Sequence, residues 1–479
     1  MLITREIINK NIRFHNVHVT LDGKIDLRSF TYDDLSKMID RYKNLLLANG
    51  AKPGYSAVIG EQISLSQTAF VFACAELGVN VTIIDQPHGK NPRPNMYVPG
   101  SISTKLKLML PITYLLSVGR EYTVNNDKTR ILMDVCRRTI IADEFTADFT
   151  PNDKILAKPD TIFLRCTSSG TTGTPKVLEH THEFMSELVK RNSKMFYGKM
   201  GVIANLNHGS SPATFFLPGL VAENITDLFH IQALIPSKLS STLTQLREKD
   251  IHMNHIMFPY STMIDEFFSY EGNNSECILY TLSVIKQEWV EHTKTKKIKD
   301  IVSIFGTNET SGTVMINQAT DHDFSENTYK KLDDFYGIHI TEKNELEVGM
   351  PIYNKMVPTG DAFAKHGDKF LHLGRSNLYR INDLELDLNK YTAMLKKECR
   401  GDIIIDTNKN SIYIVLWDNN INDRIVKDID RVMREDSGDL HFISKYDYLA
   451  ESEFLTGVKV DRQLIREHFR NMVNQNTLP

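Results

Sequence analysis

Apolar residues near the start of the chain recur with the spacing of an amphipathic helix. They are Leu35, Met38, Ile39, Tyr42, Leu45 and Leu46. Asn49-Gly50 supplies a helix stop, and a second apolar helical stretch, residues 65–77, is followed by Gly78. Short apolar runs at residues 56–59 and 79–84 predict buried strands that alternate with these helices. The alternation predicts an α/β fold of layered sheets and helices, with a largely parallel sheet.

Three further apolar runs predict strands whose ends carry small polar residues. They span residues 160–166, 200–206 and 300–305, and glycine, serine or threonine follows close after each. Because ligands of open α/β sheets collect at the carboxyl ends of strands, we expect binding residues there. Residues 89–111 are rich in proline, asparagine, glycine and serine, which predicts a surface excursion.

The last hundred or so residues have a hydrophobic pattern of their own. A strand at residues 369–373 is followed by a predicted helix (388–397), two strands joined by a hairpin (402–406 and 411–417) and a second helix (423–434). This pattern is sufficient for a small α+β domain. We therefore expect a large N-terminal domain, residues 1–373, and a small C-terminal domain, residues 374–479.

The composition agrees with a folded protein of more than one domain, since the chain has 479 residues, 24% charged and 41% hydrophobic. The 56 basic and 60 acidic residues give a net charge of −4, which provides no bulk attraction to nucleic acid. We expect no integral membrane segment, because Glu76, Gly78 and Asn80 interrupt the most apolar early stretch. The start of the chain lacks a leader pattern, and the five cysteines show no metal or redox spacing, which indicates reduced thiols in the cytoplasm.

The strongest chemical signal is a loop of glycines and hydroxyl residues directly after the apolar strand that ends near residue 166. It reads Thr167-Ser168-Ser169-Gly170-Thr171-Thr172-Gly173-Thr174-Pro175-Lys176. Glycines let backbone N–H groups approach a polyanion, and the hydroxyls and the lysine add donors and charge, as a triphosphate requires. The order is not that of a Walker loop, because Pro175 stands where that motif needs glycine and Val177 follows the lysine.

This loop, continued to His182, resembles the signature loop of the adenylate-forming superfamily. That family includes acyl-CoA synthetases, peptide-synthetase adenylation domains and beetle luciferases, and its loop wraps the β- and γ-phosphates of ATP. Further motifs similar to those of the family follow in the family's order. They are Phe30-Thr31-Tyr32, Pro53-Gly54, Phe305-Gly306-Thr307-Asn308-Glu309, Val348-Gly349-Met350-Pro351, Thr359-Gly360-Asp361, Leu373-Gly374-Arg375-Ser376 and Thr456-Gly457-Val458-Lys459.

The resemblance implies an ATP site and a role for each matching residue. The predicted ATP-binding residues are Thr167, Ser168, Ser169, Gly170, Thr171, Thr172, Gly173, Lys176, Phe305, Gly306, Asn308, Asp361 and Arg375. Phe305 would stack on adenine, Glu309 would bind Mg²⁺, and Asp361 would hold the ribose hydroxyls. Arg375 would add a contact to phosphate or ribose. Lys459 would bridge the substrate carboxylate and the α-phosphate, and the C-terminal domain would swing about a hinge at Asn377.

The acyl pocket is less well marked than the nucleotide site. His208 matches the family position where a histidine or an aromatic residue borders that pocket, a structural histidine being the alternative. Phe215 and Phe216 could line the pocket or belong to the core. Gly209 stands where amino-acid-activating relatives carry an aspartate, which favours a substrate without an α-amine.

Two histidine pairs fall outside these motifs. Neither His180 with His182 nor His252 with His255 has zinc-ligand spacing, so we expect no transition-metal site.

The chain also departs from the family pattern. Asn308 replaces a threonine and Asn377 an aspartate, and residues 281–286 contain no glycine where the family has a glycine-rich adenine wall. Arg380-Ile381-Asn382-Asp383 lacks the glycine that lines the thiol tunnel, which leaves coenzyme A as acceptor in question. One extra residue separates Gly457 from Lys459.

Together these features predict an ATP- and Mg²⁺-dependent ligase that converts a small-molecule carboxylic acid into acyl-AMP. The acyl group then passes to a thiol, most simply coenzyme A. Two alternatives stay open: an acyl-AMP ligase that uses a carrier protein or an amine as acceptor, and a non-catalytic homologue that binds an adenylate.

Overall fold

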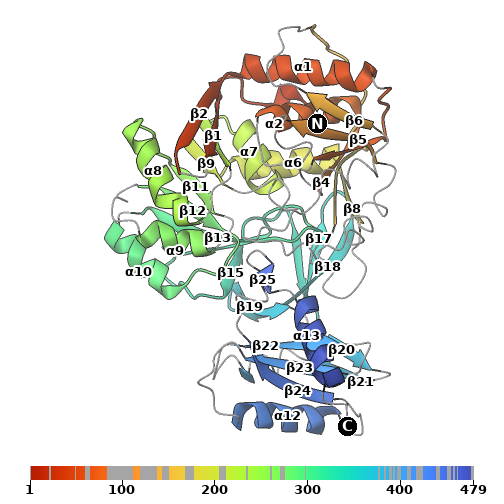
Figure 1. The fold of residues 1–479 in the computed structure, drawn as a ribbon, viewed down its shortest axis with the longest axis vertical. Helices are drawn as coiled ribbons and strands as arrows, with labels where there is room; N and C mark the ends of the chain where they lie inside the picture. The colour runs from red at the N-terminus through yellow and green to blue at the C-terminus, as the bar shows by residue number, and fades with distance from the viewer. Residues whose placement is uncertain are drawn as a thin grey trace.

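The structure is a computed structural model that describes much of the chain. The described residues are 2–20, 23–48, 50–59, 65–83, 112–118, 138–142, 150–167, 177–203, 212–232, 236–258, 261–269, 276–296, 298–375, 378–381, 384–387, 391, 394–395, 401–406, 411–416, 424–437, 443–449, 455–456, 459–460 and 462–475. In the described residues, two sheets and their helices form the N-terminal part. A three-stranded sheet, two two-stranded hairpins and helices form the C-terminal part (Figure 1).

The larger sheet has thirteen strands in the described part of the chain. In spatial order they are β16 (Gly337–Ile340), β17 (Glu345–Met350), β18 (Lys355–His366), β19 (Lys369–Arg375), β15 (Thr328–Lys331), β14 (Met315–Gln318), β13 (Asp300–Phe305), β12 (Ile278–Thr281), β11 (His255–Phe258), β9 (Gly198–Val202), β10 (Ile225–Gln232), β1 (Arg13–Val19) and β2 (Ile25–Phe30).

The described residues also form a six-stranded sheet and a set of helices. In spatial order, the strands of the six-stranded sheet are β6 (Arg138–Ala142), β5 (Ile112–Val118), β3 (Ser56–Ile59), β4 (Asn80–Ile83), β7 (Ile162–Thr167) and β8 (Val177–Thr181). The helices are η1 (Arg5–Ile7), α1 (Tyr32–Ala48), α2 (Leu65–Leu77), α6 (His182–Ser193), the π-helix η2 (Pro212–Phe216), α7 (Leu217–Val221), η3 (Pro236–Lys238), α8 (Leu239–Glu248), α9 (Ser261–Ser269) and α10 (Gln287–Lys296).

The predicted α/β class is confirmed, but the prediction of a largely parallel sheet holds for only part of the larger sheet. Strands β1 and β9–β13 pair in parallel, and the six-stranded sheet is parallel except for the β7–β8 pair. From β13 to β16 every pairing is antiparallel. In this region short turns rather than helices mostly connect consecutive strands, and only an antiparallel neighbour can be reached by so short a turn.

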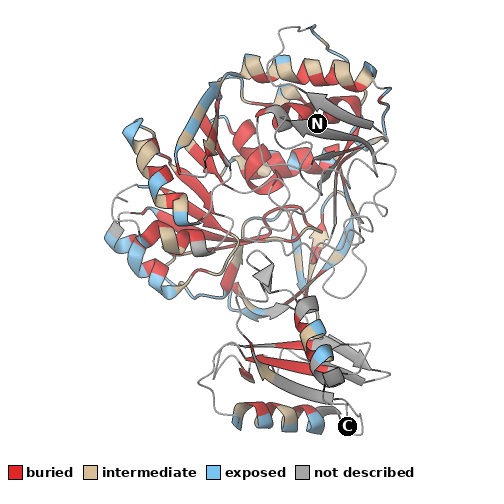
Figure 2. Cartoon of the chain, in the orientation of Figure 1, coloured by how far each residue is buried: buried red, intermediate tan, exposed pale blue. Residues whose placement is uncertain are grey.

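Apolar cores lie on both faces of the larger sheet. One core joins the two sheets around α2, α6 and α7, and the other packs α8, α9 and α10 onto the opposite face of β9–β13. Buried residues fill β11 and β13 along their whole length, as the red strands of Figure 2 show. Strands covered by helices on both faces read as continuous apolar runs, which is why residues 300–305 were recognisable in the sequence.

The C-terminal part has separate cores in its described residues. Its elements are β20 (Leu378–Ile381), β21 (Leu384–Asp387), β22 (Gly401–Asp406), β23 (Ser411–Leu416), α12 (Arg424–Ser437), β24 (Ile443–Tyr448), β25 (Leu455–Thr456), β26 (Lys459–Val460) and α13 (Arg462–Gln475). Ile412 and Ile414 of β23 pack with α12, whereas Tyr413 packs with α13, where its ring stacks on Phe469 at 4.5 Å. The described residues of these cores all follow residue 390. The boundary near residue 373 stays a prediction.

Most predicted elements occur within a few residues of their expected bounds. The predicted helix 388–397 lies mostly outside the described residues, as do the expected surface excursion at 89–111 and the hinge residue Asn377. The described cysteines Cys74 and Cys277 are buried free thiols. Phe215 and Phe216 are fully buried in the core that joins the two sheets. No helix among the described residues is long and apolar enough to cross a membrane.

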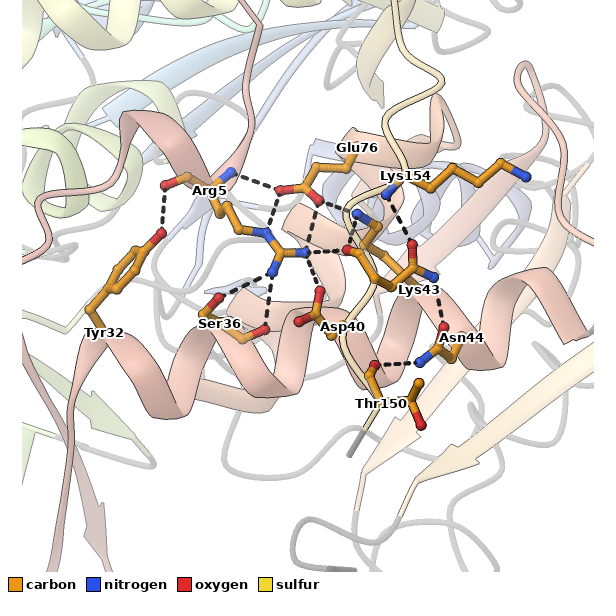
Figure 3. A network of polar contacts seen from close by, with 10 residues as sticks. Arg5, Tyr32, Ser36, Asp40, Lys43, Asn44, Glu76, Thr150 and Lys154 are labelled. Carbon is orange, nitrogen blue, oxygen red and sulfur yellow. Dashed lines mark hydrogen bonds and ion pairs between the residues drawn. The ribbon is translucent and has the colours of Figure 1, made fainter. Parts of the chain in front are cut away.

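A buried ion network fastens the start of the chain to α1 and α2 (Figure 3). The Arg5 guanidinium donates two hydrogen bonds of 3.0 Å to the Glu76 carboxylate and lies 2.6 Å from Asp40. The Lys43 ammonium, fully buried, lies 2.6 Å from Glu76 and donates to the Asn152 carbonyl at 2.8 Å. Burial would raise the pKa of Glu76, but its hydrogen bonds from Arg5 and Lys43 hold that pKa below its usual value.

We therefore predict that Glu76→Gln destabilises the protein by about 3–5 kcal/mol, because Lys43 would remain buried without its counter-charge. Urea denaturation would measure the loss. Since the pKa of Glu76 is lowered on folding, its contribution is fully present above the unfolded pKa and disappears as the pH falls through the folded value. The difference in free energy of unfolding between the wild type and Glu76→Gln should therefore become smaller at acid pH.

Glu291→Gln is the control for this prediction, since it breaks an exposed pair with Lys294 at 3.0 Å. It should change stability by less than about 1 kcal/mol. Equal urea midpoints for Glu76→Gln and Glu291→Gln would contradict the importance of the buried network.

Candidate active site

The carboxyl end of β13 carries the predicted aromatic residue and a tight turn. Phe305 is the last residue of the strand, and its carbonyl accepts a hydrogen bond of 2.9 Å from the Val314 N–H on the far side of the turn. A Cβ atom at Gly306 would overlap the carbonyl oxygen of Gly312, so only glycine allows the chain to close here.

Threonine side chains hold the turn together from within. The Thr307 N–H donates to the Thr310 hydroxyl at 3.1 Å, and that hydroxyl donates to the Thr307 carbonyl at 3.0 Å. The Tyr336 hydroxyl, from outside the turn, donates to the Thr310 carbonyl at 2.7 Å. Thr307 and Thr310 are buried, whereas Asn308 and Glu309 are half-buried. The turn thus presents the two predicted polar residues at its outer side.

Aromatic rings from three other strands surround Phe305. The Phe305 ring centroid lies 4.9 Å from that of Phe363, 5.8 Å from that of His372 and 6.0 Å from that of Tyr329. His372 in turn places its Nε2 3.5 Å from the carboxylate of Asp361, which is buried. The structure therefore brings Phe305 and Asp361 to one place, although 56 positions separate them in the sequence.

Strand pairing sets Asp361 opposite Arg375. Asp361 in β18 and Arg375 at the end of β19 are register partners in the antiparallel ladder. The Asp361 N–H donates to the Thr359 hydroxyl at 3.2 Å, and this hydrogen bond links the two residues that flank Gly360. Gly360 has a φ of +71°, a conformation that glycine adopts without strain. The side chain of Arg375 lies outside the described part of the structure.

The glycine-rich loop begins and ends on a pair of antiparallel strands. Thr167, the last residue of β7, is the register partner of Val177, the first residue of β8, so the two ends of the loop lie side by side. Further along β8, the His180 ring places Nε2 3.2 Å from the carbonyl oxygen of Asn308. The strand that leaves the loop therefore touches the turn that carries Glu309.

Burial governs the electrostatics of the histidines in this region. It lowers the pKa of both His180 and His182 to about 4, so both rings are neutral near pH 7. The His182 Nδ1 accepts a hydrogen bond of 3.1 Å from the Ile3 N–H, which is a structural contact at the start of the chain. Burial also raises the pKa of Tyr329, whose hydroxyl lies 3.2 Å from that of Ser303.

Several predicted residues lie outside the described part of the structure. They are Ser168, Ser169, Gly170, Thr171, Thr172, Gly173, Lys176, His208 and Asn377. Lys459 is described only as the first residue of β26, whose partner in the hairpin, β25, contains Thr456. The roles of these residues stay predictions.

The structure also identifies neighbours of the site that sequence reasoning missed. Phe363 follows Asp361 by two positions on β18, so strand periodicity could have placed both on one face. His372 and Tyr329 belong to other strands, and only the sheet order β18-β19-β15 reveals them. The spacing of His180 and His182 excludes a zinc site, and no local pattern indicates the contact of His180 with Asn308.

The donor set of the turn fits Mg²⁺ better than a transition metal. Glu309 is half-buried, and among the described residues it forms no salt bridge that would occupy its carboxylate. Mg²⁺ is usually bound through one or two carboxylates together with substrate phosphates. Nowhere in the described ranges do three or more His, Cys, Asp or Glu side chains form a metal-ligand group.

Comparison with known proteins finds a family model that matches the N-terminal part of the chain. Residues 15–221, which include the glycine-rich loop and β8, match the model of the family described as AMP-binding enzymes. The matched stretch is less than half of the chain, so this part of the chain is similar to AMP-binding enzymes. The whole sequence has no significant match among curated proteins.

Solved structures of adenylate-forming proteins share the fold over nearly the whole chain. O-succinylbenzoate coenzyme A synthetase (MenE) from Bacillus subtilis, in complex with ATP and magnesium ion, has a TM-score of 0.64 and 16% identity, covering 94% of this chain and 96% of that one. A benzoate CoA ligase from Burkholderia xenovorans LB400 has a TM-score of 0.68 and 12% identity, covering 97% and 100%. The adenylation domain of a keto acid-selecting NRPS module, bound to keto acyl adenylate, has a TM-score of 0.68 and 12% identity, covering 98% and 96%.

We predict that Gly306→Ala disturbs the turn after β13, because the added methyl group meets the backbone of Gly312 rather than a movable side chain. The expected cost is about 1–3 kcal/mol, measured as a lower urea midpoint. Gly337→Ala is the matched control, since its Cβ would find its nearest atom at an ordinary 3.5 Å. Equal losses of stability in the two variants would contradict the prediction, because they would show that the turn can accommodate a methyl group at residue 306.

Proposed function

We propose that the protein is an acyl-AMP-forming ligase that activates a carboxylic acid with ATP and passes the acyl group to a thiol, most simply coenzyme A. One observation carries the proposal. The aromatic end of β13, the Glu309 turn, Asp361 and the strand leaving the glycine-rich loop meet at one place. The match of residues 15–221 to the AMP-binding family model supports it, as do the ATP, magnesium and keto acyl adenylate complexes of proteins with the same fold.

The first half-reaction would bring two anions together. A carboxylate oxygen of the acid attacks the α-phosphorus of ATP, the bond from that phosphorus to the β-phosphate oxygen breaks, and pyrophosphate leaves. Asp361 would accept the ribose hydroxyls, Phe305 would lie against adenine, and residues 168–176 would hold the β- and γ-phosphates. Glu309 would hold Mg²⁺, which would supply positive charge beside the phosphates.

A cation at the reacting centre has to offset the remaining repulsion. Lys459 is our candidate, because it belongs to the motif that resembles the one carrying the family's catalytic lysine. It lies in the C-terminal hairpin β25–β26. Arg375, the register partner of Asp361, would add a contact to phosphate or ribose. His208 would border the acyl pocket, and Gly209 leaves that pocket without the carboxylate that would bind an α-amine.

The second half-reaction requires the acceptor to reach the acyl carbon. The acceptor thiol attacks that carbon, AMP leaves with the electron pair of the broken bond, and the thiol proton passes to solvent. We propose that the C-terminal part, with its own apolar cores, moves about Asn377 between the two steps. A carrier protein or an amine is the alternative acceptor, because residues 380–383 lack the glycine of the thiol tunnel.

Acid-dependent exchange of pyrophosphate into ATP, with and without coenzyme A, tests this function. A panel of aryl, alkyl and keto acids should contain at least one that supports exchange, and a thioester should then appear with coenzyme A. Exchange without thioester would leave the carrier-protein or amine acceptor in place of coenzyme A. No exchange with any acid would favour a non-catalytic adenylate-binding homologue.

We predict that Lys459→Ala lowers the rate of exchange roughly 100- to 1,000-fold, because one charge is removed from the developing transition state. ATP binding, measured by calorimetry, should change little. Lys365→Ala, at an exposed position of β18, is the control and should keep wild-type exchange. Normal exchange by Lys459→Ala would mean that another lysine supplies the cation.

A further inference from the structure

His180 connects the strand that leaves the glycine-rich loop with the turn that carries Glu309. Its side chain is almost completely buried, with 3% of the residue exposed, and its ring stacks on Phe184 at 5.4 Å. The contact joins residues 128 positions apart, His180 and Asn308, with 3.2 Å between Nε2 and the carbonyl oxygen.

The chemistry of the contact fixes the tautomer of the ring. A carbonyl oxygen can only accept, so the hydrogen atom must be on Nε2 and His180 is the donor. Because burial lowers the pKa of His180 to about 4, the ring stays neutral and keeps this tautomer at ordinary pH. A neutral donor holds the carbonyl without placing a positive charge beside a metal site.

The bonded carbonyl has a particular place in the turn. It belongs to the peptide group whose nitrogen is that of Glu309, and a peptide group is planar. Fixing the direction of the Asn308 carbonyl therefore fixes the plane of the peptide group that contains the Glu309 nitrogen. The bonds between Thr307 and Thr310 hold the two ends of the turn, and His180 holds the peptide group between them.

The histidine itself is held firmly by its surroundings. The next residue, Thr181, donates its N–H to the Tyr353 hydroxyl at 3.0 Å and accepts the Phe184 N–H at the start of α6. The Phe184 ring also lies 5.2 Å from that of Tyr353. With β8 fixed at this point, the position of His180 can set the position of the turn.

We propose that His180 is a positioning residue that orients Glu309 for the magnesium ion of the Mg²⁺–nucleotide complex. It couples the phosphate-binding loop to the metal-binding turn through the Asn308 carbonyl. The inference rests on the proposed function for the identity of the bound nucleotide and for the role of Glu309 as the metal ligand. It predicts that loss of the Nε2 donor weakens Mg²⁺ binding at the nucleotide site. Nucleotide binding in the absence of metal should not change.

The test replaces His180 and follows metal dependence. His180→Leu should raise the Mg²⁺ concentration for half-maximal pyrophosphate exchange by about tenfold, as is usual when a partner that orients a metal ligand is lost. His180→Gln, whose amide can still donate, should restore most of the difference. ATP binding in EDTA should be the same for all three proteins. His180→Phe, which keeps the stacked ring, replaces the leucine variant if that variant does not fold.

His255→Leu is the matched control. His255 is also completely buried, its pKa is also lowered to about 4, and its Nε2 accepts a backbone hydrogen bond, from Tyr197 at 3.2 Å. The control should lose stability but keep the wild-type Mg²⁺ requirement. The proposal would be overturned if His180→Leu, His255→Leu and the wild type needed the same Mg²⁺ concentration. It would also be overturned if His180→Gln failed to restore the wild-type Mg²⁺ requirement.

A binding measurement separates this inference from the proposed function. Electron paramagnetic resonance of Mn²⁺ would follow metal binding in the presence of α,β-methylene-ATP, which cannot be cleaved. Weaker Mn²⁺ binding by His180→Leu would support the positioning role even if no acid supports exchange by the wild type. Absence of Mn²⁺ binding by the wild-type protein with this nucleotide would overturn the positioning role as well.

Discussion

The close approach of Gly306 to the carbonyl oxygen of Gly312 determines how the candidate site is assembled. It forces the chain to turn back immediately after β13, the last strand of the parallel run, so that β14 can pair with it in the opposite direction. The predicted adenine contact thus ends the strand, and the predicted metal ligand sits on the outer side of the turn. A side chain at Gly306 would move both residues together.

The change from parallel to antiparallel pairing at β13 also explains why the site collects residues from distant parts of the sequence. Parallel strands deliver their carboxyl ends to one edge of the sheet. The antiparallel strands that follow bring Asp361 and His372 back beside Phe305. The strands β7 and β8 of the second sheet bring the ends of the glycine-rich loop to the same region, where His180 meets the turn.

Individual charged residues, rather than the net charge, supply the electrostatic interactions of this molecule. The net charge of −4 provides no general attraction for a polyanion such as ATP, so a few placed residues must supply it. By contrast, the cations Arg5 and Lys43 and the anions Asp40 and Glu76 compensate one another and fasten the start of the chain. Neutral buried histidines, His180 among them, provide hydrogen-bond donors and acceptors without adding charge.

The sequence alone determined the α/β class and most of the strands and helices, and it showed the resemblance to the adenylate-forming superfamily. Each depends on local patterns: hydrophobic periodicity, or short motifs read in order. It could name Phe305, Glu309, Asp361 and Lys459 as candidates, since their motifs are contiguous. It could not show the antiparallel half of the larger sheet, nor the neighbours His372, Tyr329 and His180. Those depend on strand order and on contacts across as many as 128 positions. Such contacts form only when the two sheets pack around one core, and no local pattern records that packing.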